Sequence, residues 1–148
     1  FDLLGLVRHI ISEIHNTVVL KNLSFELLIE GGPATDCSTF SVCAEERLCH
    51  PLLSNLIANA VEASPMGERV TISLSSGVEY LVSIRNRGSV PVDIRERFFE
   101  KFVTSGKAQG TGLGTYAARL FALAQGGNVE LNASEEGVTT VTVHLSKG

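Results

Sequence analysis

Residues 69–88, RVTISLSSGVEYLVSIRNRG, contain two runs in which apolar and polar side chains alternate, on either side of a turn at residues 75–79. Such alternation is typical of strands that bury one face, so the stretch predicts a β-hairpin. In the second run Val82 and Ile84 share a face, and the next residue on that face is Asn86. An unpaired buried amide costs about 1–3 kcal/mol, so we expect a partner for Asn86.

The rest of the chain mixes helical and strand-like patterns. Apolar residues at three-to-four-residue spacing indicate helices, and strict alternation indicates strands. Outside the hairpin the patterns predict helices at residues 3–21, 45–63, 93–102 and 113–125, and strands at residues 24–30, 39–42, 128–133 and 139–145. Pro51 lies inside the second helix, so either the helix kinks there or its regular part begins at His50. Helices mixed with hairpins predict an α/β two-layer sandwich, with helices on one face of a mixed, largely antiparallel sheet.

The composition excludes several classes of function. The 148 residues suit a single domain covering residues 1–148, and because no signal peptide precedes Phe1 we expect it to be part of a longer chain. An apolar content of 44% excludes a disordered segment, and a net charge of −4 argues against a nucleic-acid partner. No apolar run approaches the about 18 residues of a membrane span, so we expect no direct membrane contact by this domain.

Cysteines and histidines give no sign of a metal centre. The three cysteines, spaced six residues apart without a CxxC pair, indicate free thiols in a reducing compartment: Cys37, Cys43 and Cys49. The four histidines are scattered and none has a partner at the i+4 spacing: His9, His15, His50 and His144. A metal cluster built from them is therefore not expected.

The predicted helix at residues 45–63 carries a polar stripe beside its core face. Asn55, Asn59 and Glu62 follow at i, i+4 and i+7, so at about 100° per residue they lie within roughly 60° of one another. Asparagine is a mediocre helix former, so two of them one turn apart need a reason. The stripe is either a solvated surface or a wall of a polar cleft, whose amide oxygens suit a hard cation such as Mg²⁺.

A glycine-rich turn, QGTGLGTYAARL, opens the helix predicted at residues 113–125. It supplies three glycines and two hydroxyls: Gly110, Gly112, Gly114, Thr111 and Thr115. Free backbone N–H groups at a helix N-terminus favour phosphate binding. The spacing matches neither a Walker loop nor a dinucleotide fingerprint, so on its own the turn is weak evidence for a nucleotide.

The last predicted strand repeats the feature seen at Asn86. Thr139 shares a face with the aliphatic residues Val141, Val143 and Leu145. It is therefore a second polar side chain that points inward at a strand end. A threonine that bonds to nearby backbone is the commoner case, and a place in a site beside Asn86 is the alternative.

Four segments, in this order and with these gaps, resemble the boxes of the bacterial sensor histidine kinases. HPLLSNLIANAVEAS (50–64) resembles the N box, SIRNRGSVP (83–91) the first glycine box, RFFEKF (97–102) the F box, and GTGLGTYAARLFALAQGG (110–127) the second glycine box. The resemblance covers about residues 48–145. It implies the Bergerat fold of the GHKL superfamily, to which DNA gyrase and the heat-shock chaperones belong, with ATP and Mg²⁺ as cofactors.

The N box assigns roles on the helix predicted at residues 45–63. The resemblance implies that Asn59 coordinates Mg²⁺, that Asn55 lines the phosphate channel, and that Glu62 and Ala63 belong to the ATP-binding segment. Relatives that hydrolyse ATP carry a glutamate at the position of Asn55. An amide cannot act as a general base, which favours transfer to a protein acceptor. Glu62 stands where the kinases often carry a lysine that contacts phosphate. The positive charge near the phosphate is therefore expected from one of three other residues: Arg97, Lys101 and Lys107.

The first glycine box departs from the family pattern Asp-x-Gly-x-Gly. Gly88 is kept, Val90 replaces the second glycine, and Asn86 replaces the aspartate that accepts a hydrogen bond from the adenine amine. An amide oxygen still accepts, without charge assistance, at a loss of about 1 kcal/mol. A flipped amide would donate to a guanine carbonyl, so we expect this chain to tolerate GTP better than an Asn86→Asp variant.

The other two boxes and the last strand complete the implied ATP site. The second glycine box is expected to wrap the triphosphate through Gly110, Thr111, Gly112 and Gly114, with Leu113 packing beneath. Three aromatic residues are expected to anchor the lid that follows the F box: Phe98, Phe99 and Phe102. Thr139 is expected to reach the adenine pocket beside Asn86.

The resemblance therefore implies the catalytic domain of a two-component sensor histidine kinase, an enzyme that transfers the γ-phosphate of Mg-ATP to a histidine. The acceptor is expected on a separate helical dimerisation domain, because His9, His15 and His50 lack the family's acceptor context. A response regulator is the implied downstream partner. The domain is expected in the cytoplasm, and both a membrane-anchored and a soluble parent protein are compatible with that location. Two alternatives stay open: a degenerate nucleotide-binding module without kinase activity, and a serine-kinase anti-sigma factor of the same superfamily.

Overall fold

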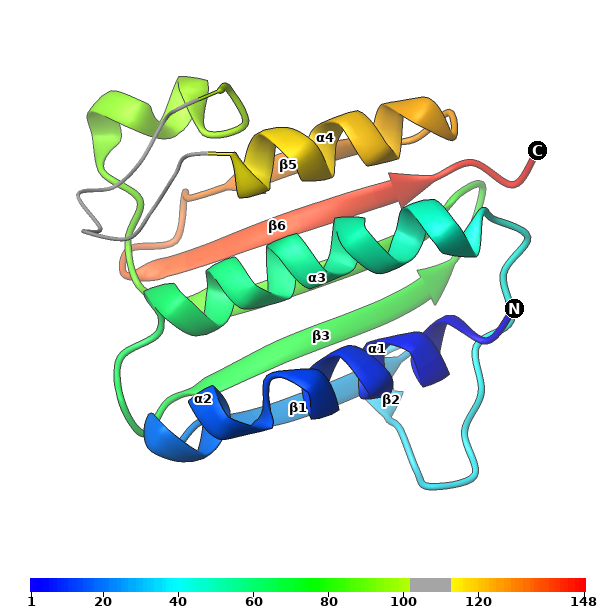
Figure 1. Cartoon of the computed structure of the whole chain (residues 1–148), viewed down its shortest axis with the longest axis horizontal. Helices are drawn as coiled ribbons and strands as arrows, with labels where there is room; N and C mark the ends of the chain where they lie inside the picture. Colours follow the sequence, from blue (N-terminus) through cyan, green and yellow to red (C-terminus); the bar gives the residue numbers. More distant parts are fainter. Residues whose placement is uncertain (102–112) are drawn as a thin grey trace.

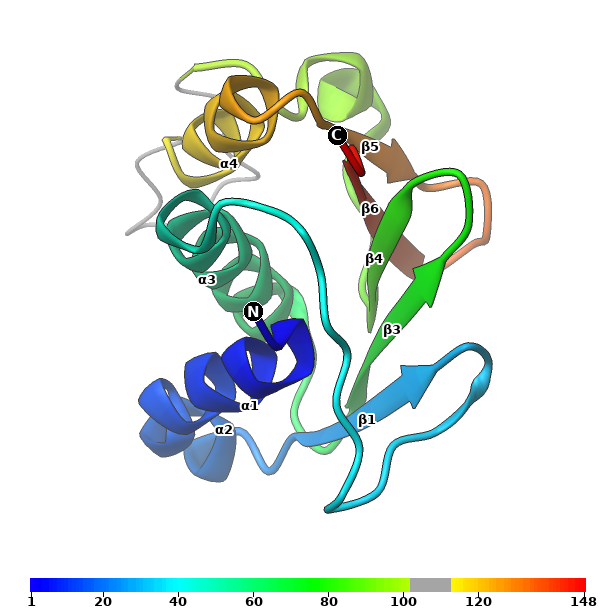
Figure 2. The same cartoon turned by 90° about the vertical axis from the view of Figure 1, so that its right-hand side faces the viewer.

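The chain folds into two layers, a six-stranded sheet and helices that cover one of its faces (Figure 1; Figure 2). The structure, a computed structural model, describes residues 1–101 and 113–148. Its helical elements are α1 (Leu3–Glu13), α2 (His15–Leu20), α3 (Glu46–Ala63), the 3-10 helix η1 (Val92–Arg97) and α4 (Gly114–Ala124). Its strands are β1 (Ser24–Ile29), β2 (Gly32–Pro33), β3 (Arg69–Ser76), β4 (Tyr80–Arg87), β5 (Asn128–Asn132) and β6 (Val138–Leu145).

The sheet is mixed, in the order β2-β1-β3-β4-β6-β5. β1 and β3 run parallel, and every other neighbouring pair is antiparallel. The predicted hairpin forms β3 and β4, with Ile72 opposite Ile84, and the pairing of β4 with β6 sets Asn86 opposite Thr139. The predicted two-layer sandwich with a largely antiparallel sheet is confirmed.

The core fills the space between the helices and the face of the sheet that they cover (Figure 2). Among its fully buried side chains are Leu3, Val7 and Ile10 of α1, Leu52, Leu53 and Ile57 of α3, Ile72 and Leu74 of β3, and Ile84 of β4. The other face of the sheet is polar, as the 3.3 Å contact of the Ser83 and Thr142 hydroxyls illustrates. A one-residue slip would move every apolar side chain to that polar face, so burial sets the register.

Three predicted elements differ from the structure. The helix expected at residues 3–21 is interrupted at Ile14, whose N–H bonds to the Ile11 carbonyl, an i→i−3 bond that tightens the turn and separates α1 from α2. Residues 39–42 form no strand and pair with the start of the chain through one bridge, between Asp2 and Ser41. The short helix expected at residues 93–102 is the 3-10 helix η1, which ends at Arg97.

Pro51 does not delay the start of α3, which begins at Glu46 and continues through the proline. In a regular helix the N–H of this position would bond to the carbonyl of Arg47. Arg47 is exposed, so water can take the place of the lost donor. None of the described helices has both the length and the apolar character that crossing a bilayer requires.

Candidate functional site

The polar stripe of α3 faces the start of α4. Asn55 and Asn59 are half-buried, whereas Glu62 and Ala63 are exposed. A Cβ atom added to Gly114, the first residue of α4, would lie 3.9 Å from the Asn55 Oδ1 atom. The structure therefore brings the N box and the start of α4 in the second glycine box together, although Gly114 follows Asn55 by 59 positions along the chain.

The buried amide of Asn86 lies at the end of β4, beside Thr139 of β6. Asn86 is 4% exposed and Thr139 is 5% exposed. The Asn86 Nδ2 atom donates to the Arg87 carbonyl at 2.9 Å, and the Thr139 Oγ1 atom donates to the Gly88 carbonyl at 2.8 Å. The partner expected for the amide is therefore the neighbouring backbone, and it meets the N–H side of the amide.

This hydrogen bond also fixes which way the amide points. A flip would place Oδ1 against the Arg87 carbonyl, so that two acceptors would face each other. It would forfeit a bond that contributes about 0.5–1.5 kcal/mol. The bond therefore leaves Oδ1 as the atom of the amide that can accept a further hydrogen bond, as a carboxylate oxygen could at this position.

Gly88 lets the chain after β4 pass close to the end of α3. Its φ of +133° is a backbone conformation that favours glycine, and a Cβ atom there would lie 2.9 Å from the carbonyl oxygen of Ala63. Its N–H donates to the Gly137 carbonyl at 2.9 Å. The first glycine box is thus held between the C-terminal end of α3 and the turn before β6, which explains why this glycine is required.

The F box packs on the core and holds the start of α4. Phe98 is buried, and its ring meets that of Phe99 edge to face, with 4.9 Å between the centroids. The Thr115 hydroxyl, in the first turn of α4, donates to the Phe98 carbonyl at 2.8 Å and is buried. The Thr115 hydroxyl, one of the two that the glycine-rich turn supplies, therefore has its proton engaged by the backbone. Val90, which replaces the second glycine, is also buried in this part of the core.

Two of the three predicted cationic residues belong to the described part of the chain. Arg97 and Lys101 are exposed, and the Lys101 Nζ atom lies 5.8 Å from the centroid of the Tyr116 ring, next to the first turn of α4. Lys107 lies outside the described residues, as do Phe102, Gly110, Thr111 and Gly112. Leu113, predicted to pack beneath the triphosphate, is 37% exposed.

Lys21 is a cationic residue of this region that the sequence patterns missed. Its Nζ atom donates to the carbonyls of Val61 and Glu62 at 2.8 and 3.0 Å. A positive charge there stabilises carbonyls in the last turn of α3, where intrahelical donors run out, and offsets the helix dipole. No local signal identifies this role, because Lys21 follows α2 and reaches α3 only in the folded chain.

The assembled groups fit a ligand with an anionic part and an amine. The start of α4 has no acidic residue in its first turn, so its N–H groups and dipole favour an anion. The amide side chains of α3 supply hard oxygen atoms, which suit Mg²⁺ with water and phosphate as its other ligands. At the sheet, Asn86 supplies a buried acceptor for an amine. The described groups at the start of α4, on α3 and at Asn86 therefore fit Mg-ATP, the ligand that the resemblance implies.

Residues 44–148 match the family described as histidine kinase-, DNA gyrase B- and HSP90-like ATPases. The chain belongs to this family. Over 103 residues it is 33% identical to the sensor histidine kinase WalK of Bacillus subtilis, a match that covers 64% of this chain and 17% of WalK. Over 144 residues it is 26% identical to sporulation kinase D of the same organism, covering 96% of this chain and 28% of that kinase.

Solved structures of this ATPase family show the same fold. The catalytic domain of the histidine kinase ThkA superposes with a TM-score of 0.83 at 25% identity, covering 99% of this chain and 93% of that domain. Full-length ShkA, solved in complex with AMPPNP, matches with a TM-score of 0.78 at 22% identity over 98% of this chain and 30% of ShkA. The chain thus corresponds to the catalytic domain, and it spans between 17% and 28% of the two curated relatives named above.

Proposed function

We propose that this chain binds Mg-ATP as the catalytic domain of a sensor histidine kinase and transfers the γ-phosphate to a histidine on a separate helical domain. The observation that carries the proposal is the buried Asn86 amide, whose Nδ2 bond to Arg87 leaves Oδ1 as an acceptor for the adenine amine. Family membership supports it, and so does the likeness to histidine kinase catalytic domains. Because α1 and β6 share one core, we propose that residues 1–148 act as one domain.

The triphosphate would lie between α3 and the start of α4, where Asn55 approaches Gly114. Asn55 would hold the phosphate chain, and the N-terminus of α4 would stabilise its negative charge. Asn59 would hold Mg²⁺, which supplies neutralisation of charge on the phosphates when bound. Lys101, beside Tyr116 at the first turn of α4, is the described cation best placed to assist. Catalysis of this kind depends mainly on position and charge.

Transfer, rather than hydrolysis, follows from the residue at position 55. A water molecule attacking the γ-phosphate would need a base, and the side chain there is the amide of Asn55. The acceptor would instead be a histidine of the helical dimerisation domain, and a response regulator would then receive the phosphoryl group. Since ATP is a cytoplasmic substrate, we propose a cytoplasmic location for this domain.

The test has two steps. Mg-ATP binding to the chain is measured by calorimetry, and the helical domain is then added to look for phosphohistidine. We expect binding that weakens at least about tenfold in Asn59→Ala, whereas Asn16→Ala, the same change at an exposed position of α2, leaves the affinity unchanged. Binding without transfer would identify a regulatory module instead, and absence of binding would refute the proposal altogether. Phosphorylation of a serine would indicate the anti-sigma-factor type.

A second experiment tests the adenine contact. Asn86→Asp removes the amide N–H groups, so no side-chain donor is left for a guanine carbonyl and the ratio of ATP affinity to GTP affinity should rise several-fold. Because the same change removes the donor to the Arg87 carbonyl, the ratio is measured rather than either affinity alone. The wild-type chain should still prefer ATP, because the flip that would favour GTP forfeits the bond to Arg87, which corresponds to roughly 2- to 12-fold in affinity. An unchanged ratio in Asn86→Asp would contradict the assignment of Asn86 to the base.

A further inference from the structure

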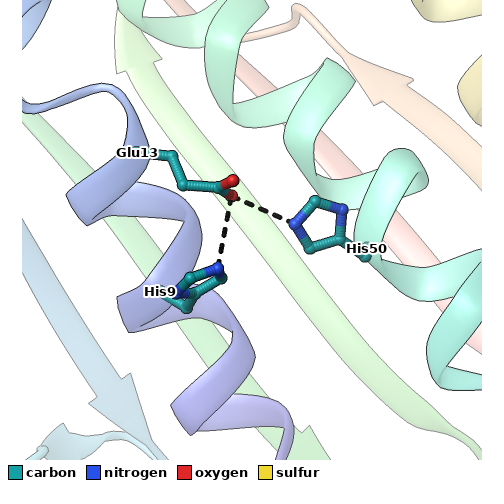
Figure 3. Close-up of side chains that lie close together, drawn as sticks. All are labelled: His9, Glu13 and His50. Atoms are coloured by element: carbon teal, nitrogen blue, oxygen red, sulfur yellow. Dashed lines mark hydrogen bonds and ion pairs between the residues drawn. The ribbon is translucent and has the colours of Figure 1, made fainter.

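A second cluster of polar side chains joins α1 to α3 (Figure 3). His9 and Glu13 lie one turn apart on α1, and His50 comes from the first half of α3. The His50 Nε2 atom lies 3.0 Å from the Glu13 Oε1 atom, and the His9 Nε2 atom lies 3.9 Å from the same oxygen. Both imidazole rings therefore direct a nitrogen at one carboxylate oxygen.

A metal cluster built from the histidines was not expected, because the local spacing does not show which residues the fold brings together. The residue at i+4 from His9 is a carboxylate rather than a second histidine, and His50 is 37 positions further along than Glu13. The fold supplies the third group because the apolar faces of α1 and α3 pack on the same core, side by side. The two imidazole rings end with their centroids 6.1 Å apart.

The three groups have the chemistry and spacing of a transition-metal site. Zn²⁺ binds imidazole nitrogen and carboxylate oxygen at about 2.0–2.2 Å in tetrahedral geometry, which sets neighbouring ligand atoms roughly 3.4 Å apart. One nitrogen of each histidine and one oxygen of Glu13 all lie within 4.8 Å of one another. Small side-chain rotations therefore suffice to bring them to binding distance, without movement of either helix.

We propose that His9, Glu13 and His50 bind a divalent transition metal ion, with Zn²⁺ as the best fit and water in the fourth position. Imidazole ligands select Zn²⁺, Cu²⁺ or Ni²⁺ over Mg²⁺, which prefers oxygen ligands. The site is therefore distinct in chemistry from the Mg²⁺ site proposed at Asn59. The side chains of His9, Glu13 and His50 are 64%, 45% and 40% exposed, so the ion has direct access from solvent.

Binding would clamp α1 to the helix that carries the nucleotide site. His50 precedes Asn55 by five positions on α3, whereas His9 and Glu13 belong to α1, which packing and the His50–Glu13 hydrogen bond join to α3. A bound ion replaces the His50–Glu13 hydrogen bond with stronger coordination at both helices. We expect the result to be a more stable pairing of α1 and α3.

Zinc alone, without nucleotide, is the probe. Titration of ZnCl₂ into the chain should give one site by calorimetry, and zinc at about 100 times its Kd should raise Tm by roughly 5–10 °C. Cys37→Ser/Cys43→Ser provides the background for all measurements, because its two substitutions remove the exposed thiols, which also bind zinc. In that background His9→Gln and His50→Gln should each weaken binding at least about tenfold.

The matched control is His15→Gln, the same substitution at an exposed histidine of α2, which should leave zinc affinity unchanged. The measured quantity is the difference in Tm with and without zinc for each variant. Loss of the His50–Glu13 hydrogen bond lowers Tm in both measurements and therefore does not affect this difference. If His50→Gln and His15→Gln bind zinc equally well, the site is wrong. Loss of zinc binding in the background without exposed thiols, or an equal rise in Tm with MgCl₂, would also overturn the proposal.

Discussion

Replacement of Gly88 by alanine tests the approach of the first glycine box to α3. At this position the backbone has φ +133°, and an added Cβ would lie 2.9 Å from the carbonyl oxygen of Ala63, closer than such contacts occur in proteins. The obstacle is backbone at the end of a helix rather than a flexible side chain. Gly88→Ala must therefore move either the end of α3 or the segment that follows β4.

The loss of stability in Gly88→Ala has two contributions, one from the backbone conformation and one from the close contact. A side chain in a sparsely populated backbone region costs about 1–3 kcal/mol, and relief of an overpacked contact adds about 1–3 kcal/mol. Together they lower the free energy of unfolding by about 2–6 kcal/mol, and each kcal/mol lowers Tm by roughly 2–4 °C for a domain of this size. ATP affinity should fall as well, because the Gly88 carbonyl holds Thr139 beside Asn86.

Alanine substitutions at two other glycines distinguish the backbone contribution from the contact contribution. Gly31 also has a positive φ, +83°, but nothing lies within 4 Å of an added Cβ, so Gly31→Ala carries the backbone term alone. Gly77 has open space and no positive φ, so Gly77→Ala should change stability by less than about 0.5 kcal/mol. Urea unfolding gives the three free energies. If Gly88→Ala costs no more than Gly31→Ala, the close approach to α3 has no energetic weight and the reasoning fails.

Three further predictions concern groups that the structure placed. Thr115→Val removes the buried hydroxyl that donates to the Phe98 carbonyl, so the free energy of unfolding should fall by about 1–3 kcal/mol in a urea titration. Lys21→Met removes the donor at the end of α3 and should lower the free energy of unfolding by about 1–2 kcal/mol. An unchanged Tm in a thermal melt would contradict this prediction. Burial raises the pKa of the Cys49 thiol, so a thiol reagent should modify two cysteines of the native chain and three of the unfolded chain. Because the thiol of Cys49 ionises at lower pH in the unfolded chain than in the folded one, its contribution to stability should be fully present below about pH 8.5 and be lost as the pH rises above that value. Urea unfolding at pH 7 and at pH 10 measures the difference.

Local patterns were sufficient to predict most elements of the fold. Alternation over residues 69–88 predicted β3 and β4, because the core removes one face of each strand from water. The same reasoning failed at Ile14 and at residues 39–42. Ile14 continues the apolar spacing of α1 and yet ends the helix through an i→i−3 bond to Ile11, and residues 39–42 have a strand-like composition but form a bridge between Asp2 and Ser41 rather than a strand.

The period of each strand and helix was enough to predict which side chains face the interior. It indicated Asn86 and Thr139 as inward polar groups and predicted the stripe of Asn55 and Asn59. The contacts of these groups could not be predicted in this way, because hydrogen-bond partners come from segments that only the fold brings near. The bond from Asn86 to Arg87 turned the amide into an oriented acceptor. The contacts of Lys21 with α3, and of His9 and Glu13 with His50, likewise join segments about 40 positions apart, a separation that no local period encodes.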